Sequence, residues 1–250
     1  MITLKNAEQL EIMKRAGRIT GEALALAGEA VHEGITTKHL DSIIRAYIEK
    51  QGAKPSFLGY AGFPGSACIS INDEVIHGIP SASRVLQEGD IVKIDVGAFW
   101  HGFHGDSANT FPVGHVSDEA KKLIEVTKKS FEAGFEKVVP GNRIGDVGSA
   151  IEAVVKENGF SVVRKYIGHG VGQELHEQPD VPNYGTPGRG PRLAVGMTIA
   201  IEPMVNIGTS LVQEKADRWT VFTADHKLSA HYEHTVALTP DGAIRLTAVD

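Results

Sequence analysis

Four acidic side chains lie in segments that are otherwise typical of apolar β-strands. Asp95 lies within KIDVGA, and Asp106 follows it by eleven residues. Glu202 lies within TIAIEPMV, and Glu233 begins EHTVAL. Aspartate is depleted in strands, and a buried carboxylate without a partner is costly. Each residue alone could be solvent-facing or paired with an arginine, but four carboxylates on strand segments indicate a metal site.

Asp95 and Asp106 are expected to lie side by side, because a turn at His101-Gly102 would pair the two strands that carry them. Two adjacent carboxylates repel each other unless they are protonated or bridged by a cation. The alternative is a solvent-facing aspartate and a separate aspartate in a turn. Four carboxylates balance the charge of two divalent cations, so the composition favours a two-metal site that activates water.

Three histidines stand beside or close to glycine. His169 lies in GHGVGQELH, His176 follows it by seven residues, and His77 lies in NDEVIHGIP. A lone histidine is more often structural than a ligand, but glycine lets a ligand approach closely and thus favours function here. A thiolate-rich metal site is excluded because Cys68 is the only cysteine. The chain contains neither a G-x-S-x-G elbow nor a phosphate-binding loop.

The composition is that of an ordinary soluble protein, with 42% hydrophobic and 22% charged residues among 250. The 25 lysines and arginines against 31 aspartates and glutamates give a net charge of −6, which argues against DNA or RNA as a partner. A single cysteine excludes an intrachain disulfide. The N-terminal segment has no signal-peptide core and no segment reaches membrane-spanning length, so we expect a cytoplasmic protein without a membrane partner.

The apolar periodicity, together with glycine and proline breaks, predicts two helices followed by strands, twice over. The expected helices cover residues 7–31, 37–52, 117–135 and 145–158, and the expected strands residues 67–71, 90–99, 103–113, 161–168, 197–207, 219–223 and 231–238. Asp241-Gly242 is expected to close a last hairpin. No low-complexity linker divides the chain, so residues 1–250 are predicted to form a single α+β domain of two halves.

Five segments resemble the motifs of the type I methionine aminopeptidases: INDEVIHGIP, VKIDVGAFWHGFHGDSANTF, GHGVGQELHEQP, AIEPMV and SAHYEHTVALT. The resemblance covers nearly the whole chain, and the 31 residues from Glu202 to Glu233 leave no room for the insertion of the type II enzymes, which favours the short bacterial form. The family has the pita-bread fold, a pseudo-twofold antiparallel sheet with helices packed on its outer face. The resemblance implies a single catalytic domain that removes the initiator methionine by metal-assisted peptide hydrolysis and favours a small second residue.

The resemblance also implies which residues hold two divalent metal ions. Asp106 and Glu233 would bridge the ions, Asp95 would complete one site, and His169 with Glu202 would complete the other. Glu202 further resembles the catalytic residue that handles the proton of the bridging water. Cobalt, manganese, iron, nickel and zinc all suit such a site, and cellular availability decides among them.

Substrate contacts are implied in the same way. His77 and His176 resemble two histidines that are not ligands, contact the substrate amide and stabilise the tetrahedral intermediate. The pocket for the methionine side chain would involve four further residues: Tyr60, Phe63, Cys68 and Trp219. The N-termini of nascent polypeptides are the expected partners, a monomer is the family expectation, and the task would bring the protein to the ribosome, although no motif shows such an association.

At three positions the chain departs from the commonest family pattern. Leu175 stands where many members have Phe, Phe63 where Tyr is frequent, and His231 where Gln is common. We expect none of the three to be a metal ligand, so they leave the metal chemistry intact and bear on the shape and range of the substrate pocket.

Two other functions compete with this interpretation. A proline-directed peptidase or creatinase would share the fold, but those proteins resemble longer chains with an additional N-terminal domain. A non-catalytic binding module on the same fold would have lost metal ligands, whereas all five ligand positions are filled here. Metal analysis and activity on a Met-Ala peptide would separate the three.

Overall fold

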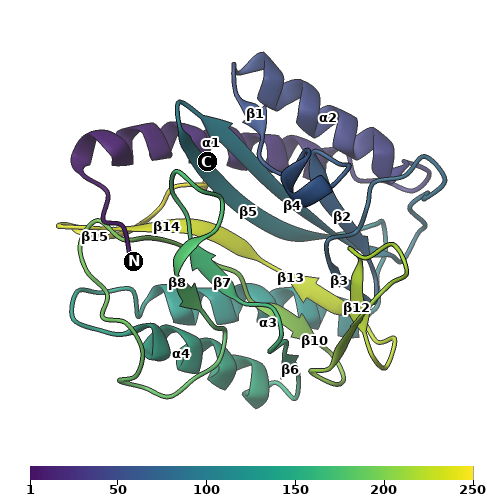
Figure 1. Cartoon of the computed structure of the whole chain (residues 1–250). Helices are drawn as coiled ribbons and strands as arrows, with labels where there is room; N and C mark the ends of the chain where they lie inside the picture. The colour runs from purple at the N-terminus through teal and green to yellow at the C-terminus, as the bar shows by residue number, and fades with distance from the viewer. Residues whose placement is uncertain (250) are drawn as a thin grey trace.

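Strands from both halves of the sequence meet in one antiparallel sheet of nine strands in the computed structural model, which describes residues 1–249 (Figure 1). Their order is β1-β4-β5-β14-β9-β7-β8, with β2 beside β4 and β15 beside β14. Their bounds are β1 (Lys54–Pro55), β2 (Ala67–Ile71), β4 (Ile91–Trp100), β5 (Phe103–Pro112), β7 (Gly168–Gly170), β8 (Glu177–Val181), β9 (Thr198–Ile201), β14 (Glu233–Thr239) and β15 (Gly242–Arg245).

Two smaller sheets and the helices complete the described part of the chain. One sheet joins β13 (Ser229–His231), β10 (Met204–Asn206) and β6 (Ser161–Val162), and the other joins β11 (Val212–Glu214), β12 (Val221–Thr223) and β3 (Glu74–Ile76). The helices are α1 (Ala7–Glu29), α2 (Thr37–Lys50), α3 (Asp118–Phe135) and α4 (Ile144–Glu157), with a 3-10 turn η1 (Tyr60–Gly62). Within residues 1–249, no helix has the combination of length and apolarity that crossing a membrane requires.

Local capping explains why the helices begin where the sequence predicts. The Asn6 side chain accepts a hydrogen bond from the Gln9 N–H, and the Gln9 side chain accepts one from the Asn6 N–H, which closes a capping box. Thr36 caps α2 and Ser117 caps α3 in the same manner. The four predicted helices are therefore confirmed, with α1 and α2 each ending two residues earlier than expected.

The alternation of side chains along β4 decides which residues face the helices. Val92, Ile94 and Val96 are fully buried in the hydrophobic core that includes residues of α1 and α2. Successive side chains of a strand point to opposite faces, so Asp95 is turned to the other side of the sheet. One strand thus supplies core residues on one face and a carboxylate on the other.

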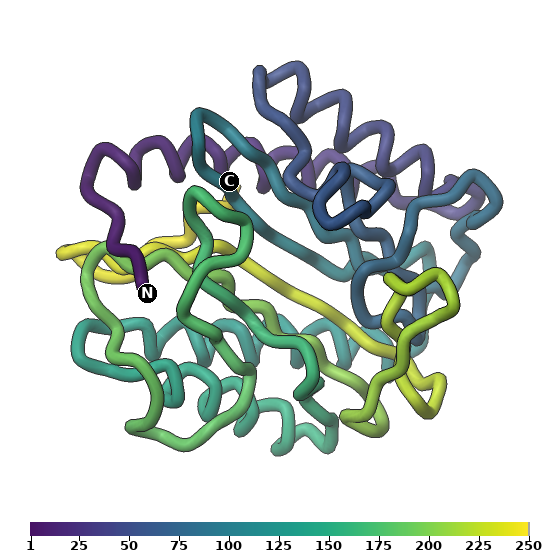
Figure 2. Tube along the Cα trace, viewed as in Figure 1, coloured from purple at the N-terminus to yellow at the C-terminus, as the bar shows by residue number. Residues whose placement is uncertain are grey.

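The strand β14 repeats this arrangement in the second half. Val236 and Leu238 pack in a core with residues of α3 and α4, such as Phe131 and Ile151, whereas Glu233 falls on the opposite face. Figure 2 shows the yellow C-terminal strand running alongside the teal β5. Pairing of β14 with both β5 and β9 joins the two halves into one sheet, each half with its own pair of helices on the outer face.

Close approach of α1 to β5 depends on two glycines. A Cβ atom on Gly105 would lie 2.7 Å from the Cα atom of Gly17, which is closer than real side chains come to backbone. The hydroxyl of Thr20 donates a hydrogen bond of 3.2 Å to the carbonyl of Gly105 across this contact. The helix can therefore pack directly on the strand that carries Asp106.

The predicted strands of the second half are longer than the real ones. Residues 161–168 form only β6 and the first residue of β7, and in the irregular segment between them the Lys165 and Tyr166 side chains bind Glu214 on β11. Residues 197–207 divide into β9 and β10 at Pro203, which has no N–H for a ladder hydrogen bond. Residues 231–238 divide at Tyr232 into the end of β13 and most of β14.

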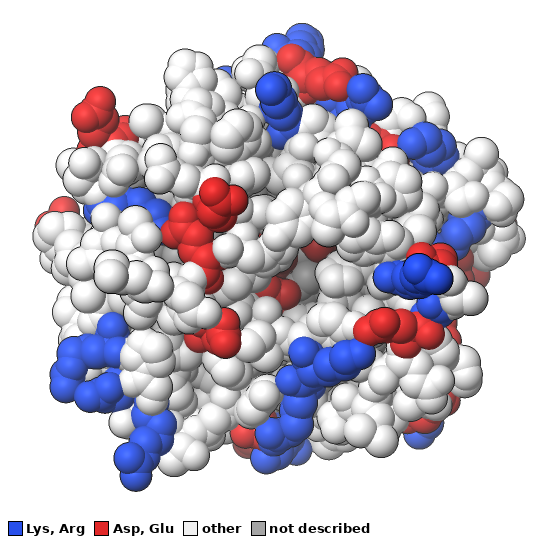
Figure 3. Space-filling view, in the orientation of Figure 1, with Lys and Arg blue, Asp and Glu red and all other residues white. Residues whose placement is uncertain are grey.

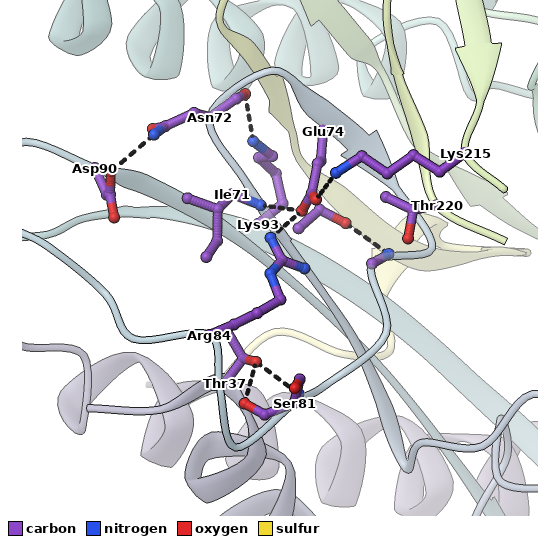
Figure 4. Close-up of polar contacts among 12 residues, drawn as sticks. Thr37, Ile71, Asn72, Glu74, Ser81, Arg84, Asp90, Lys93, Lys215 and Thr220 are labelled. Atoms are coloured by element: carbon purple, nitrogen blue, oxygen red, sulfur yellow. Dashed lines mark hydrogen bonds and ion pairs between the residues drawn. The ribbon is translucent and has the colours of Figure 1, made fainter. Parts of the chain in front are cut away.

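A buried ionic cluster ties the loops around the sheet together (Figure 4). The Lys93 ammonium, which is buried on β4, donates a hydrogen bond of 2.7 Å to the Asn72 carbonyl. Burial lowers the pKa of this ammonium to about 7. Glu74 on β3 accepts hydrogen bonds from Arg84 at 2.5 Å and from Lys215 at 2.6 Å. The cluster thus joins β3 to β4 and to the hairpin of β11 and β12.

Candidate metal centre and substrate pocket

A cavity of about 490 Å³ opens at the face of the sheet that bears the carboxylates. Acidic surface is visible inside a hollow near the centre of this face in Figure 3. Every site residue expected from the sequence lines this one cavity: Tyr60, Phe63, Cys68, His77, Asp95, Asp106, His169, His176, Glu202, Trp219 and Glu233. The tertiary structure therefore brings together residues from ten separate places along the sheet, its loops and the turn η1.

The five candidate metal ligands come from five different segments. Asp95 and Asp106 lie on the paired strands β4 and β5, in diagonal positions, because Asp95 is opposite Ala108 and Asp106 opposite Gly97. Glu233 is the first residue of β14. His169 is the middle residue of β7, and Glu202 occupies the gap between β9 and β10. Both halves of the chain thus contribute candidate metal donors to one cavity.

The orientation of His169 suits a metal ligand. Its Nδ1 lies 2.8 Å from the Gly170 carbonyl, so Nδ1 carries the proton that this hydrogen bond needs and Nε2 keeps its lone pair. Nε2 lies 3.4 Å from Oε1 of Glu202 and 3.8 Å from Oδ2 of Asp106. A metal ion between these donors would satisfy all three at once.

Buried oxygen atoms without partners support a cation at this point. Oδ1 of Asp95, Oδ1 of Asp106 and Oε1 of Glu233 are buried and have no hydrogen-bond partner. Donor atoms of Asp106, His169 and Glu233 lie within 4.8 Å of one another. Buried polar groups are normally paired, and hard carboxylate oxygens with an imidazole nitrogen suit divalent transition metals. The residues present therefore fit a divalent metal centre.

The carboxylates bind protons tightly in the metal-free protein. Burial, followed by the neighbouring Asp106, raises the pKa of Asp95 well above its ordinary value. Burial likewise raises the pKa of Asp106 to about 7, and burial together with the other carboxylates raises the pKa of Glu202 and Glu233. Taking several like charges out of water disfavours ionisation until a cation is present.

His77 and His176 both line the cavity beside the donor cluster. The His176 ring lies 4.2 Å from the His169 ring, and its Nδ1 is 2.7 Å from the Tyr60 hydroxyl. His77 has a left-handed backbone with φ of 60° and packs edge-on against Trp219. Burial, and then the charge of His176, lowers the pKa of His77 to about 4, so this ring is neutral near pH 7.

The apolar part of the cavity is built around Phe63. Its ring lies edge-on to Trp219 with 5.1 Å between centroids, and Cys68 and Leu175 belong to the same buried cluster. Burial, and then the charge of Asp95, raises the pKa of the Cys68 thiol well above its usual value, so the thiol stays neutral. Leu175 is 2% exposed and lines the cavity, as its neighbourhood to His176 in the sequence suggested.

Sequence reasoning missed several residues of the cavity wall, among them Phe57, Ile76 and Tyr166. Ordinary apolar residues carry no chemical signal, and only their packing reveals a pocket. The sequence also marked His231 as a departure from the family pattern but gave it no place in the site. Only the folded chain shows that His231 lies directly against Glu202 and Glu233.

Comparisons with known proteins agree with this geometry. The model of metallopeptidase family M24 matches residues 11–240. A methionine aminopeptidase of Clostridium perfringens is 54% identical over 249 residues, which are 100% of both chains. The crystal structure of a methionine aminopeptidase from Thermotoga maritima matches with a TM-score of 0.98 at 43% identity and 100% coverage of both chains.

A prolidase from Pyrococcus furiosus has the same fold, with a TM-score of 0.81 at 26% identity, but this chain spans only 66% of it. The chain under study therefore belongs to metallopeptidase family M24 and, within that family, to the methionine aminopeptidases. The expected pita-bread fold is confirmed by these matches. Family membership and the donor cluster together make it a divalent-metal-dependent hydrolase.

Proposed function

We propose that the protein removes the N-terminal methionine from nascent polypeptides that have a small second residue. One observation carries the proposal: a buried cluster of four carboxylates and an imidazole lies at the wall of an apolar cavity of about 490 Å³. Such a cavity accepts one unbranched side chain, and the cluster lies where the adjoining peptide bond would be placed. The identity with methionine aminopeptidases supports the same substrate.

In this proposal Asp106 and Glu233 would be shared by two ions, Asp95 would be a ligand of one ion, and His169 with Glu202 would be ligands of the other. Their convergence on one cavity, with donor atoms of Asp106, His169 and Glu233 within 4.8 Å of one another, supports this assignment. Two divalent ions there would polarise the scissile carbonyl and make a water nucleophilic near neutral pH. Mn, Fe, Co, Ni and Zn ions all suit a mixed carboxylate and imidazole donor set.

The protein's own groups handle the proton and the developing charge. Glu202 is the general base, because its carboxylate lies beside the donor cluster, 3.4 Å from Nε2 of His169, and can take the proton from the attacking water and then give it to the leaving amine. His77 and His176 donate hydrogen bonds to the substrate amide and to the oxyanion of the tetrahedral intermediate. The Tyr60 hydroxyl holds the His176 ring in place for this role.

The methionine side chain fits the apolar wall formed by Phe63, Cys68 and Trp219, with Tyr60 at its mouth. Tyr60 is 44% exposed, whereas Phe63 is 3% exposed, which places the two rings at the rim and the bottom of the pocket. A flexible thioether packs favourably against ring edges. The proposal includes a monomer in the cytoplasm that meets its substrates at the ribosome.

The experiment compares peptides on protein stripped of metal and reloaded with each ion in turn. Met-Ala and Met-Gly peptides should be cleaved, Met-Lys and Met-Trp peptides poorly, and metal-free protein should be inactive. A preference for peptides with proline in the second position and no need for methionine would overturn the proposal in favour of the proline-directed relatives that share this fold.

A further inference from the structure

His231 lies behind the carboxylate cluster with both ring nitrogens unpaired. Its side chain is 1% exposed, and neither Nδ1 nor Nε2 has a hydrogen-bond partner. Buried imidazoles are normally hydrogen-bonded, so two unpaired nitrogens on one ring need an explanation. Within residues 1–249, His231 is the histidine whose two ring nitrogens are both buried without a partner.

The backbone of His231 is held in place by hydrogen bonds at both its N–H and its carbonyl. Its N–H donates a hydrogen bond of 2.9 Å to the Thr110 hydroxyl, and its carbonyl accepts one of 2.8 Å from the same hydroxyl. His231 also pairs with Met204 in the ladder of β13 and β10. These contacts hold the ring against the carboxylates of the metal centre.

Nε2 of His231 lies at the distance of a neighbouring metal ligand from Glu233 and farther from Glu202. Nε2 lies 3.6 Å from Oε2 of Glu233 and 3.9 Å from Oε2 of Glu202, which is too long for hydrogen bonds. Metal bonds of about 2.0–2.2 Å place adjacent donors of one ion roughly 3.0–3.6 Å apart. The pair of His169 and Glu202, at 3.4 Å, has the same spacing.

A complete set of donors is present on this side of the cluster. Donor atoms of Asp95, His231 and Glu233 lie within 4.8 Å of one another. We propose that Nε2 of His231 is a second imidazole ligand of the metal centre, on the ion held by Asp95 and Glu233. This inference rests on the metal centre of the proposed function and adds a sixth protein residue to it.

The additional nitrogen has a consequence for metal preference. Imidazole suits Zn, Fe, Co and Ni, whereas an all-oxygen set suits Mn and Mg. With His231 in place each ion has one imidazole, and without it one ion has only carboxylates from the protein. We therefore expect His231→Gln to weaken Co²⁺ binding at this site by roughly 10- to 100-fold, and Mn²⁺ binding by a smaller factor.

The test counts imidazole ligands in the protein loaded with two Co²⁺ ions per chain. Proton NMR should show two solvent-exchangeable imidazole N–H signals with large contact shifts, one of which His169→Ala removes and the other His231→Gln removes. His234→Gln is the matched control, because His234 lies on the adjoining strand and its nitrogens bond Tyr232 and Thr247 instead. This variant should keep both signals.

The outcomes separate the two proposals. If the wild-type protein binds two Co²⁺ ions but shows a single contact-shifted imidazole, lost in His169→Ala, the role of His231 as a ligand is overturned and the metal centre stands. If the wild-type protein fails to bind Co²⁺ in a calorimetric titration, the proposed function fails with it. The wild-type count decides the matter even if His231→Gln does not fold.

Discussion

Two histidines that stand seven residues apart both have Nδ1 engaged in a hydrogen bond, but their rings lie against different groups. Nδ1 of His169 is engaged by the Gly170 carbonyl, which leaves Nε2 for a ligand. Nδ1 of His176 is engaged by the Tyr60 hydroxyl, and its ring lies against His169 rather than against the carboxylates. The first should therefore act on metal binding, and the second on the transition state.

We predict that His169→Ala loses one metal ion and regains part of its activity in excess metal. His176→Ala should keep both ions but turn over about a hundred- to thousandfold more slowly, because a hydrogen bond to the developing charge is lost. Calorimetric metal titration beside steady-state kinetics on a Met-Ala peptide measures both. Loss of an ion from His176→Ala, with both ions retained in His169→Ala, would reverse the assignment.

A third residue, Leu175, lines the substrate pocket. Leu175→Phe should leave metal content unchanged and change the preference for methionine over norleucine, because a ring contact with sulfur contributes about 0.5–1.5 kcal/mol. The measurement is the ratio of kcat/KM for the two side chains. The control is Leu211→Phe, the same exchange at a 67% exposed position. An unchanged ratio in Leu175→Phe would show that this residue does not contact the substrate side chain.

At the scale of elements, Glu74 joins three segments that surround the pocket. It lies on β3, where it is the ladder partner of Phe222 on β12, and it bonds Arg84 and Lys215. The carboxylate is almost fully buried, whereas the two cations are partly exposed. Although burial by itself raises the pKa of Glu74, Arg84 and Lys215 outweigh it and hold that pKa below 4.5.

We predict that Glu74→Gln lowers the free energy of unfolding by about 2–4 kcal/mol, since it removes one partner of a buried pair. A depressed folded-state pKa gives stability that is present above the unfolded value of 4.5 and is lost as pH falls through the folded pKa. The difference in the free energy of unfolding between the wild type and Glu74→Gln should therefore shrink as the pH falls below 4.5.

Urea denaturation at several pH values measures this difference. Glu214→Gln is the control on the neighbouring strand β11, where a 48% exposed carboxylate pairs with Lys165. An exposed pair contributes about 0–1 kcal/mol, so this variant should unfold nearly as the wild type does. Equal effects of the two substitutions would show that the buried cluster does not hold the elements together.

For the whole molecule, the metal centre is the place where the two halves are joined. Asp95 and Asp106 come from the first half, and Glu202 and Glu233 from the second. Without metal these carboxyls hold protons more tightly than ordinary carboxyls do, because burial raises the pKa of Asp106 to about 7 and also raises the pKa of Asp95 and of Glu233. Metal ligands must be deprotonated, so metal binding, proton release and stability are coupled.

We predict that metal binding strengthens as the pH rises through about 7 and releases protons into solution. For the metal-free protein, stability changes with pH in the opposite direction. A carboxyl whose pKa is raised on folding makes the free energy of unfolding fall as the pH rises from 3.8 towards about 7. The increase in Tm on adding metal should therefore grow with pH. Calorimetry in two buffers of different ionisation enthalpy counts the protons, and identical heats in both buffers would contradict the coupling.

The sequence by itself determined the helices, the first hairpin and the chemical types of the site. The side chains of Asn6 and Ser117 cap their helices by accepting hydrogen bonds from N–H groups in the first turn. The apolar alternation of β4 is contained within ten residues, so these features depend on local chemistry. The resemblance to the methionine aminopeptidases placed every predicted residue in the cavity where the structure finds it.

Only the tertiary structure decided how the second half is divided and what lies behind the site. The break at Pro203 leaves Glu202 between β9 and β10, which belong to different sheets. At Tyr232 the chain passes from β13 to β14, so His231 and Glu233 also lie on different sheets. Such details depend on which strands pair over more than a hundred residues of chain, as β14 does with β5. Local patterns carry no information on that pairing, because it is set by the packing of the two halves against each other.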